Sequence, residues 1–143
     1  MADILHLFDI KVSPEKVFDG ITVSAGLDQW WTEHSSGTPG MNEIYTLDFG
    51  PGYIWKAIVT RFVPAKEFEL KMTEAEEDWL HTLIGFKLSS NQNNTKLEFY
   101  HSGWATESEH YRGSSYCWAM YLRILKRYLE YGETVPYSKR LNV

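Results

Sequence analysis

Between residues 43 and 104 the chain alternates apolar and polar residues, and this alternation constrains its fold more than any other feature. Five segments share the pattern and are separated by short turns: 43–49, 53–62, 67–72, 81–88 and 95–104. Successive side chains of a strand point to opposite faces, so each segment predicts a strand with one buried face. Turns as short as "GPG" at 50–52 join antiparallel neighbours and exclude a parallel doubly wound sheet. The pattern predicts an antiparallel meander.

The first 42 residues predict one further strand and two short helices. "ILHLFDIKV" (4–12) alternates, with Ile4, His6, Phe8 and Ile10 on one face. Ser13 and Pro14 are typical of a helix start, as N-cap and first helical residue. "SAGLDQWW" (24–31) indicates a second short helix, and Gly37, Pro39 and Gly40 indicate that the next ten residues are loop.

One long amphipathic helix is expected last. Thr106 and Glu109 have the spacing of a capping box, although the Gly113-Ser114-Ser115 run favours a regular start nearer Tyr116. The apolar stripe consists of Trp118, Leu122, Leu125 and Leu129. Gly132 predicts the C-terminal stop, and residues 134–143 form a tail.

These elements predict a single α+β domain over residues 1–143, because a chain of this length supports one sizeable core. We expect a helix-grip fold, in which a curved antiparallel sheet wraps around the long C-terminal helix and two short helices follow the first strand. Where sheet and helix do not meet fully, a cavity results, and ligands commonly bind in such cavities.

Charge and composition argue against several functions. The net charge is −5, and no concentrated basic patch indicates nucleic-acid binding. Cys117 is the only cysteine, which fits a reducing cytoplasm. No signal peptide is apparent, and no apolar stretch approaches the ~18 residues of a membrane span.

Three segments resemble a known family. They are "VSPEKVFDGIT" with "LDQWW", the "HSGW" tetrapeptide at 101–104, and "CWAMYLRILKRYLEYGE" at 117–133. Together they resemble the START-like, helix-grip (SRPBCC) superfamily, and within it the branch named after the activator of the heat-shock protein 90 ATPase. The resemblance implies an apolar cavity between sheet and C-terminal helix that binds lipids, sterols, polyketides or similar molecules. Some members are cyclases or dehydratases.

Strand and helix phases predict which residues would line such a cavity. They are Trp55, Leu70, Thr82, Phe86, Phe99, His101, Trp118 and Tyr121. His101 has two interpretations: a polar anchor or proton carrier, since histidine titrates near neutrality, or a core histidine that is hydrogen-bonded to backbone. The aromatic residues have two as well, a ligand wall or ordinary core filling.

Other candidate residues give weaker indications of a binding or catalytic role. Trp30 and Trp31 are adjacent, so they cannot share a helix face, and we expect buried anchors or a residue at the pocket mouth. Arg61 is in phase with Trp55 and either pairs with a carboxylate or an anionic ligand, or emerges to solvent. The histidines and Cys117 show no metal-ligand spacing, and Cys117 fits a packed, inert thiol.

The first hypothesis is therefore a binding protein for a small apolar molecule, without cofactor or metal. The second is a cyclase- or dehydratase-type enzyme that uses His101 as general acid or base. The third is a partner protein that regulates a chaperone ATPase through an exposed patch of Trp31, Trp79 and the acidic segment 74–78. A homodimer is compatible with all three.

Overall fold

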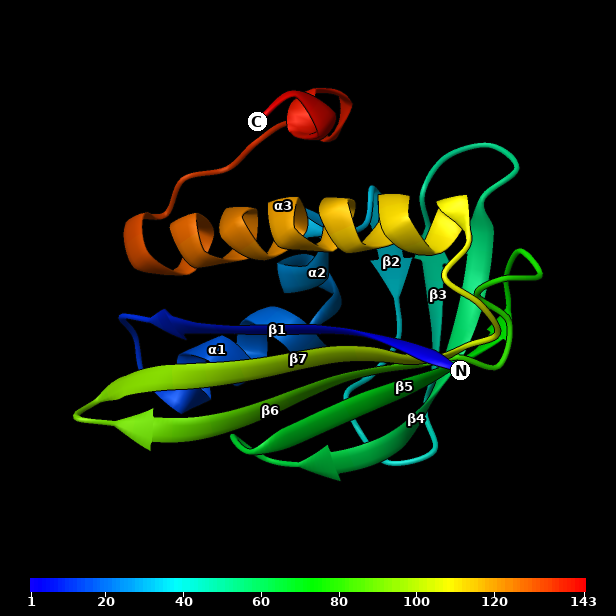
Figure 1. The fold of residues 1–143 in the computed structure, drawn as a ribbon. Helices are drawn as coiled ribbons and strands as arrows, with labels where there is room; N and C mark the ends of the chain where they lie inside the picture. Colours follow the sequence, from blue (N-terminus) through cyan, green and yellow to red (C-terminus); the bar gives the residue numbers. More distant parts are fainter.

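A seven-stranded antiparallel sheet curves around one long helix in the computed structural model, which describes residues 1–143 (Figure 1). The sheet order is β1-β7-β6-β5-β4-β3-β2. The strands are β1 (Ala2–Ile10), β2 (His34–Ser36), β3 (Ile44–Asp48), β4 (Ile54–Val63), β5 (Glu67–Glu74), β6 (Leu83–Asn91) and β7 (Asn94–Trp104). This architecture confirms the predicted α+β helix-grip fold.

Two short helices follow β1, as predicted: α1 (Pro14–Thr22) and α2 (Ser24–Trp30). The Ser13 hydroxyl caps α1 by accepting a hydrogen bond from the backbone N–H of Lys16 at 3.4 Å. Val17 and Ile21 on α1 are fully buried, so one face of this helix packs into the core.

The C-terminal helix α3 (Glu109–Tyr131) begins where the sequence analysis did not expect it. The prediction of a capping box that starts at Thr106 was wrong. The N-cap is Ser108, whose hydroxyl accepts a hydrogen bond from the Tyr111 N–H at 3.2 Å. A regular start near Tyr116 was also wrong. Ser114 is buried and accepts a hydrogen bond from the Trp79 indole, so a tertiary contact outweighs its poor helix propensity. Gly132 ends the helix with φ +70°, as predicted.

Two elements occur where the sequence analysis expected only loop or tail. Strand β2 pairs with β3, His34 opposite Asp48 and Ser36 opposite Thr46. It has three residues, too few to show alternation. Beyond α3, residues Tyr137–Asn142 form a short 3-10 helix, η1, which buries Arg140.

A register shift between Val59 and Arg61 corrects the predicted phase of β4. The irregularity at Thr60 moves Arg61 out of phase with Trp55 and Val59, so Arg61 lies opposite Glu69 and is exposed. The Arg61 guanidinium lies 3.7 Å from the Glu69 carboxylate. Of the two interpretations of Arg61, the structure shows a solvent-exposed side chain beside a carboxylate.

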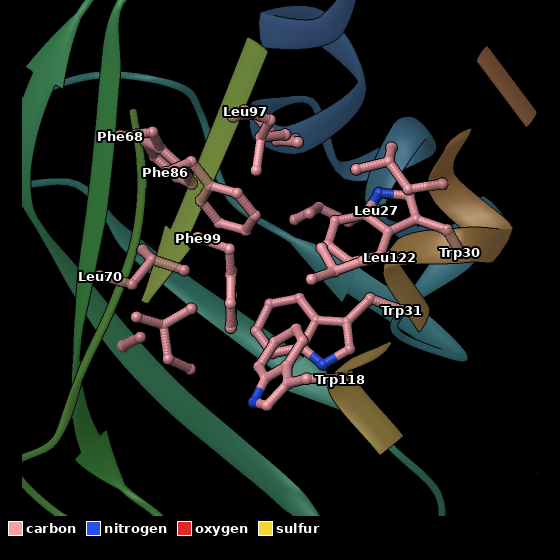
Figure 2. Close-up of a cluster of buried hydrophobic side chains, with 14 of the residues drawn as sticks. Leu27, Trp30, Trp31, Phe68, Leu70, Phe86, Leu97, Phe99, Trp118 and Leu122 are labelled. Atoms are coloured by element: carbon pink, nitrogen blue, oxygen red, sulfur yellow. The ribbon is translucent and has the colours of Figure 1, made fainter. Parts of the chain in front are cut away.

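The core lies between the concave face of the sheet and the helices (Figure 2). It joins 26 buried apolar residues, which come from α1, α2, α3, six of the strands and two connecting segments. The predicted inward faces of β5, β6 and β7 are confirmed: Leu70, Phe86 and Phe99 are at most 2% exposed. None of the helices combines the length and the hydrophobicity that a membrane span requires.

Candidate functional site

A cavity of about 340 Å³ lies between the N-terminal half of α3 and the β3–β4 hairpin. Eight of the twelve lining residues are aromatic. The lining consists of Trp31, Phe49, Tyr53, Trp55, Trp79, His110, Gly113, Ser114, Cys117, Trp118, Tyr121 and Tyr137. Four other hollows on the molecule have a smaller share of hydrophobic lining residues. A concave, mainly apolar lining is typical of small-molecule sites, so this cavity is the candidate site.

Segments that are far apart in the sequence supply the aromatic wall. Phe49, Tyr53 and Trp55 come from the β3–β4 hairpin, and Trp31 lies at the C-terminal end of α2. Trp79 comes from the β5–β6 connection, and its ring stacks on Trp118 with centroids 6.1 Å apart. The contacts between these rings hold the wall together.

The opposite wall is a stripe of polar groups on α3 that starts with the imidazole of His110. Ser114, Cys117 and Tyr121 follow the i, i+3, i+7 spacing and therefore share one helix face. Burial raises the pKa of the Cys117 thiol, and burial with the nearby Tyr137 raises the pKa of Tyr121 to about 12. Both groups are protonated near neutral pH. The lining contains no carboxylate, lysine or arginine.

His101 lies in the core, with no exposed surface, within a chain of hydrogen bonds. The Trp118 indole N–H, which can only donate, donates to Nδ1 of His101 at 3.0 Å. The other ring nitrogen, Nε2, lies 2.8 Å from the Thr82 hydroxyl, and that hydroxyl donates to the Trp79 carbonyl at 2.5 Å. Because the Thr82 proton is committed to Trp79, Nε2 carries the histidine proton and donates to Thr82.

This environment keeps His101 neutral. Burial, with a smaller effect from His110, lowers its pKa to about 3. Both ring nitrogens are engaged and neither reaches the cavity surface, so no substrate atom can approach them. Of the two interpretations, the structure supports a core histidine, with side-chain partners in place of the backbone partners we expected.

The structure brings three of the eight predicted site residues to the cavity: Trp55, Trp118 and Tyr121. The other five are at most 2% exposed inside the core and do not line it: Leu70, Thr82, Phe86, Phe99 and His101. Figure 2 shows Leu70, Phe86 and Phe99 among the packed core side chains. Ligand contact by any of the eight stays a prediction.

Several lining residues were not among the eight predicted ones. Trp31 and Trp79 were expected in an exposed patch, but they are 1% and 8% exposed, which corrects that expectation. Trp30 and Trp31 are both buried, as the buried-anchor interpretation predicts, and Trp31 also borders the cavity, as the alternative interpretation predicts. Tyr137 was assigned to the tail, where only its aromatic character after Pro136 hinted at packing. The structure holds no group of three His, Cys, Asp or Glu side chains placed to bind a metal ion.

The chain matches a known protein family and is similar to several solved structures. The family model described as "Activator of Hsp90 ATPase homolog 1-like protein" matches residues 11–130. The solution structure of the Aha1 dimer from Colwellia psychrerythraea is similar over 93% of this chain and 99% of that chain, with 31% identity and a TM-score of 0.85. No match was found among curated proteins.

Two more distant structures show the fold alone. SSP2350 from Staphylococcus saprophyticus is 19% identical with a TM-score of 0.79, over 94% of this chain and 96% of that chain. CalU16 from Micromonospora echinospora is 18% identical with a TM-score of 0.75, over 96% of this chain and 83% of that chain.

Proposed function

The chain belongs to the family of Activator of Hsp90 ATPase homolog 1-like proteins, within the START-like superfamily, and on that basis we propose that it binds a small, neutral, mainly apolar molecule in the aromatic cavity. One observation carries the proposal: eight aromatic side chains surround a hollow whose lining bears no carboxylate, lysine or arginine. Desolvating a charged ligand there would be costly, whereas an apolar ligand gains from burial.

The arrangement of the walls narrows the ligand further. Aromatic rings from the β3–β4 hairpin offer faces and edges for stacking. The α3 stripe of Ser114, Cys117 and Tyr121 offers hydrogen-bonding groups along the other side. This combination favours a flat molecule with polar groups along one edge. The molecule must also be small, because the cavity volume is at the low end of the range usual for ligand pockets.

Native mass spectrometry of the freshly purified protein tests the proposal directly. We expect a stoichiometric adduct that denaturation releases. Tyr53→Ala, which removes a ring from the mouth, should reduce the bound fraction about tenfold. Tyr116→Ala is the matched control, since this tyrosine lies on α3 but is 82% exposed and does not line the cavity. A wild-type protein that carries no adduct, and whose thermal stability no apolar probe raises, would contradict ligand binding.

A second function is favoured by the similarity to the Aha1 dimer. We propose regulation of a chaperone ATPase as the alternative, with a homodimer as the assembled form. The exposed patch first considered for it is not present, because Trp31 and Trp79 are buried. A change in heat-shock protein 90 ATPase turnover on adding this protein would support the alternative, and sedimentation velocity would measure the assembly. Unchanged turnover and a monomer would exclude it.

A further inference from the structure

The chain does not leave the fold after α3 but returns along the helix and closes one side of the cavity. Gly132, with φ +70°, turns the chain, and the segment ending in η1 runs back over α3 (Figure 1, red). This segment carries Tyr137 to the cavity, beside Trp31, Cys117 and Tyr121. It lies beyond Glu130, where the family match ends.

Two polar side chains fix the segment to the body. The Tyr137 hydroxyl donates to the carbonyl of Phe49 at 2.9 Å. Arg140 is 4% exposed and donates to Asp28 O at 2.7 Å and Thr32 O at 3.1 Å, both at the end of α2. Its third bond, from Nε to Val135 O at 3.0 Å, lies within the segment itself. No carboxylate forms an ion pair with Arg140; three backbone carbonyls accept from its guanidinium, which also lies over the Tyr137 ring, 5.3 Å from its centroid.

Apolar anchoring of the same segment is sparse. Val135 packs against the core, but Leu141 and Val143 are 69% and 59% exposed. The ion pair between Arg127 and Glu133 at its start joins two half-exposed side chains, which contributes little. Regions with few buried apolar contacts open at a lower free energy than the whole molecule unfolds. Besides the Arg140 and Tyr137 bonds, only the contacts of Val135 and of the Tyr137 ring would have to break to release the segment.

We propose that residues 133–143 form a strap that detaches from the body and recloses over the cavity. Arg140 is the positioning residue that holds the strap shut, and Tyr137 is the ligand-contacting side chain that the strap delivers. The inference rests on the proposed function in one respect: the molecule that the cavity takes up would pass beneath the strap. The closed strap would then add a ring to the cavity wall and limit the size of that molecule.

Cys117 provides a test that needs no ligand. It is the only cysteine, and it lines the same cavity as Tyr137. The thiol is half-buried, and the rate at which fluorescein maleimide labels it, at mildly alkaline pH, measures how accessible it is to a bulky reagent. Arg140→Gln should raise this rate about tenfold. Arg123→Gln, at an exposed arginine on α3 that makes no ion pair, should leave it unchanged.

A second variant separates strap opening from general unfolding. Tyr137→Phe keeps the ring in the cavity and removes only the bond to Phe49, so it should raise the rate about threefold with an unchanged melting temperature. If both variants are labelled at the wild-type rate, the proposal that the strap detaches is overturned. If Arg140→Gln lowers the melting temperature, its faster labelling could come from general unfolding. The labelling rate of Tyr137→Phe then tests the strap: a raised rate supports it, and a wild-type rate overturns it.

The outcomes also separate the strap from the proposed function. Wild-type rates together with a bound adduct would overturn the strap and leave ligand binding standing. Accelerated labelling without any adduct would support the strap and contradict the ligand.

Discussion

At the scale of single residues, the chain of hydrogen bonds through His101 shows how the polar atoms of a buried side chain are satisfied. Trp118, His101, Thr82 and Trp79 form an unbroken donor–acceptor series that leaves neither ring nitrogen unpaired. The series fixes one tautomer and positions the Trp118 ring, which lines the cavity. Removing His101 would strand the indole N–H and perturb the wall, because an unsatisfied buried donor costs about 1–3 kcal/mol.

The depressed pKa of His101 predicts a pH-dependent stability. The folded protein holds it neutral with a pKa of about 3, against an ordinary value of 6.5. Between these values the unfolded chain binds a proton that the folded protein does not, so the free energy of unfolding falls as pH decreases below 6.5. From pH 7 to pH 5 we expect this group to remove about 2 kcal/mol, at most ~1.4 kcal/mol per pH unit.

Urea denaturation at several pH values measures this effect. His101→Gln does not titrate and should lose most of the dependence, whereas His34→Gln, at an exposed position on β2, should keep it. Equal pH dependence in the wild type and His101→Gln would refute the assignment.

At the scale of elements, contacts across strands on the outer face of the sheet stabilise it. Tyr100 on β7 lies opposite Gly85 on β6, and its ring packs over the glycine. The Tyr100 hydroxyl donates to the Glu69 carboxylate on β5, which also accepts from Thr60 at 2.7 Å. One cluster thereby links β4, β5, β6 and β7, the strands that carry much of the core face.

Gly85→Ala tests this cluster. A Cβ at residue 85 would overlap the Tyr100 ring, so the ring and its bond to Glu69 must shift. We expect a loss of about 1–3 kcal/mol in the free energy of unfolding, measured by urea denaturation. In Gly113→Ala, a helical control with no atom within 4 Å of the new Cβ, we expect no loss and a gain of about 0.5–1 kcal/mol. Equal changes in the free energy of unfolding of the two variants would mean that the Tyr100 ring moves aside without cost.

At the scale of the whole molecule, one cluster of 26 buried residues joins both halves of the chain. Strand β1 pairs with β7, so the first and last strands are neighbours and neither end of the meander can separate without breaking the sheet. This arrangement favours a single cooperative unit over residues 1–143, which stays a prediction from the sequence.

Equilibrium unfolding followed by two probes checks that prediction. Five of the six tryptophans are buried, so their fluorescence reports the core, while far-UV circular dichroism reports the helices and sheet. For one cooperative domain the two transitions should coincide. Separate midpoints would indicate two units.

The sequence by itself determined most of the elements. The two-residue period identified the inward faces of β5, β6 and β7, and Ser13 and Gly132 marked helix ends. These features follow from the sequence because side-chain alternation and capping are local: a strand face repeats every two residues, and a cap lies within a turn of its helix.

Only the tertiary structure decided where α3 begins, how β4 is phased beyond Thr60, and where the cavity lies. Periodicity placed Phe99 and Trp55 on inward faces alike, yet Phe99 is packed in the core and Trp55 lines a cavity. An empty volume is the mismatch between surfaces supplied by distant segments, such as Trp31, Trp79 and Tyr137. No local pattern records that mismatch, because it exists only once those segments have packed together.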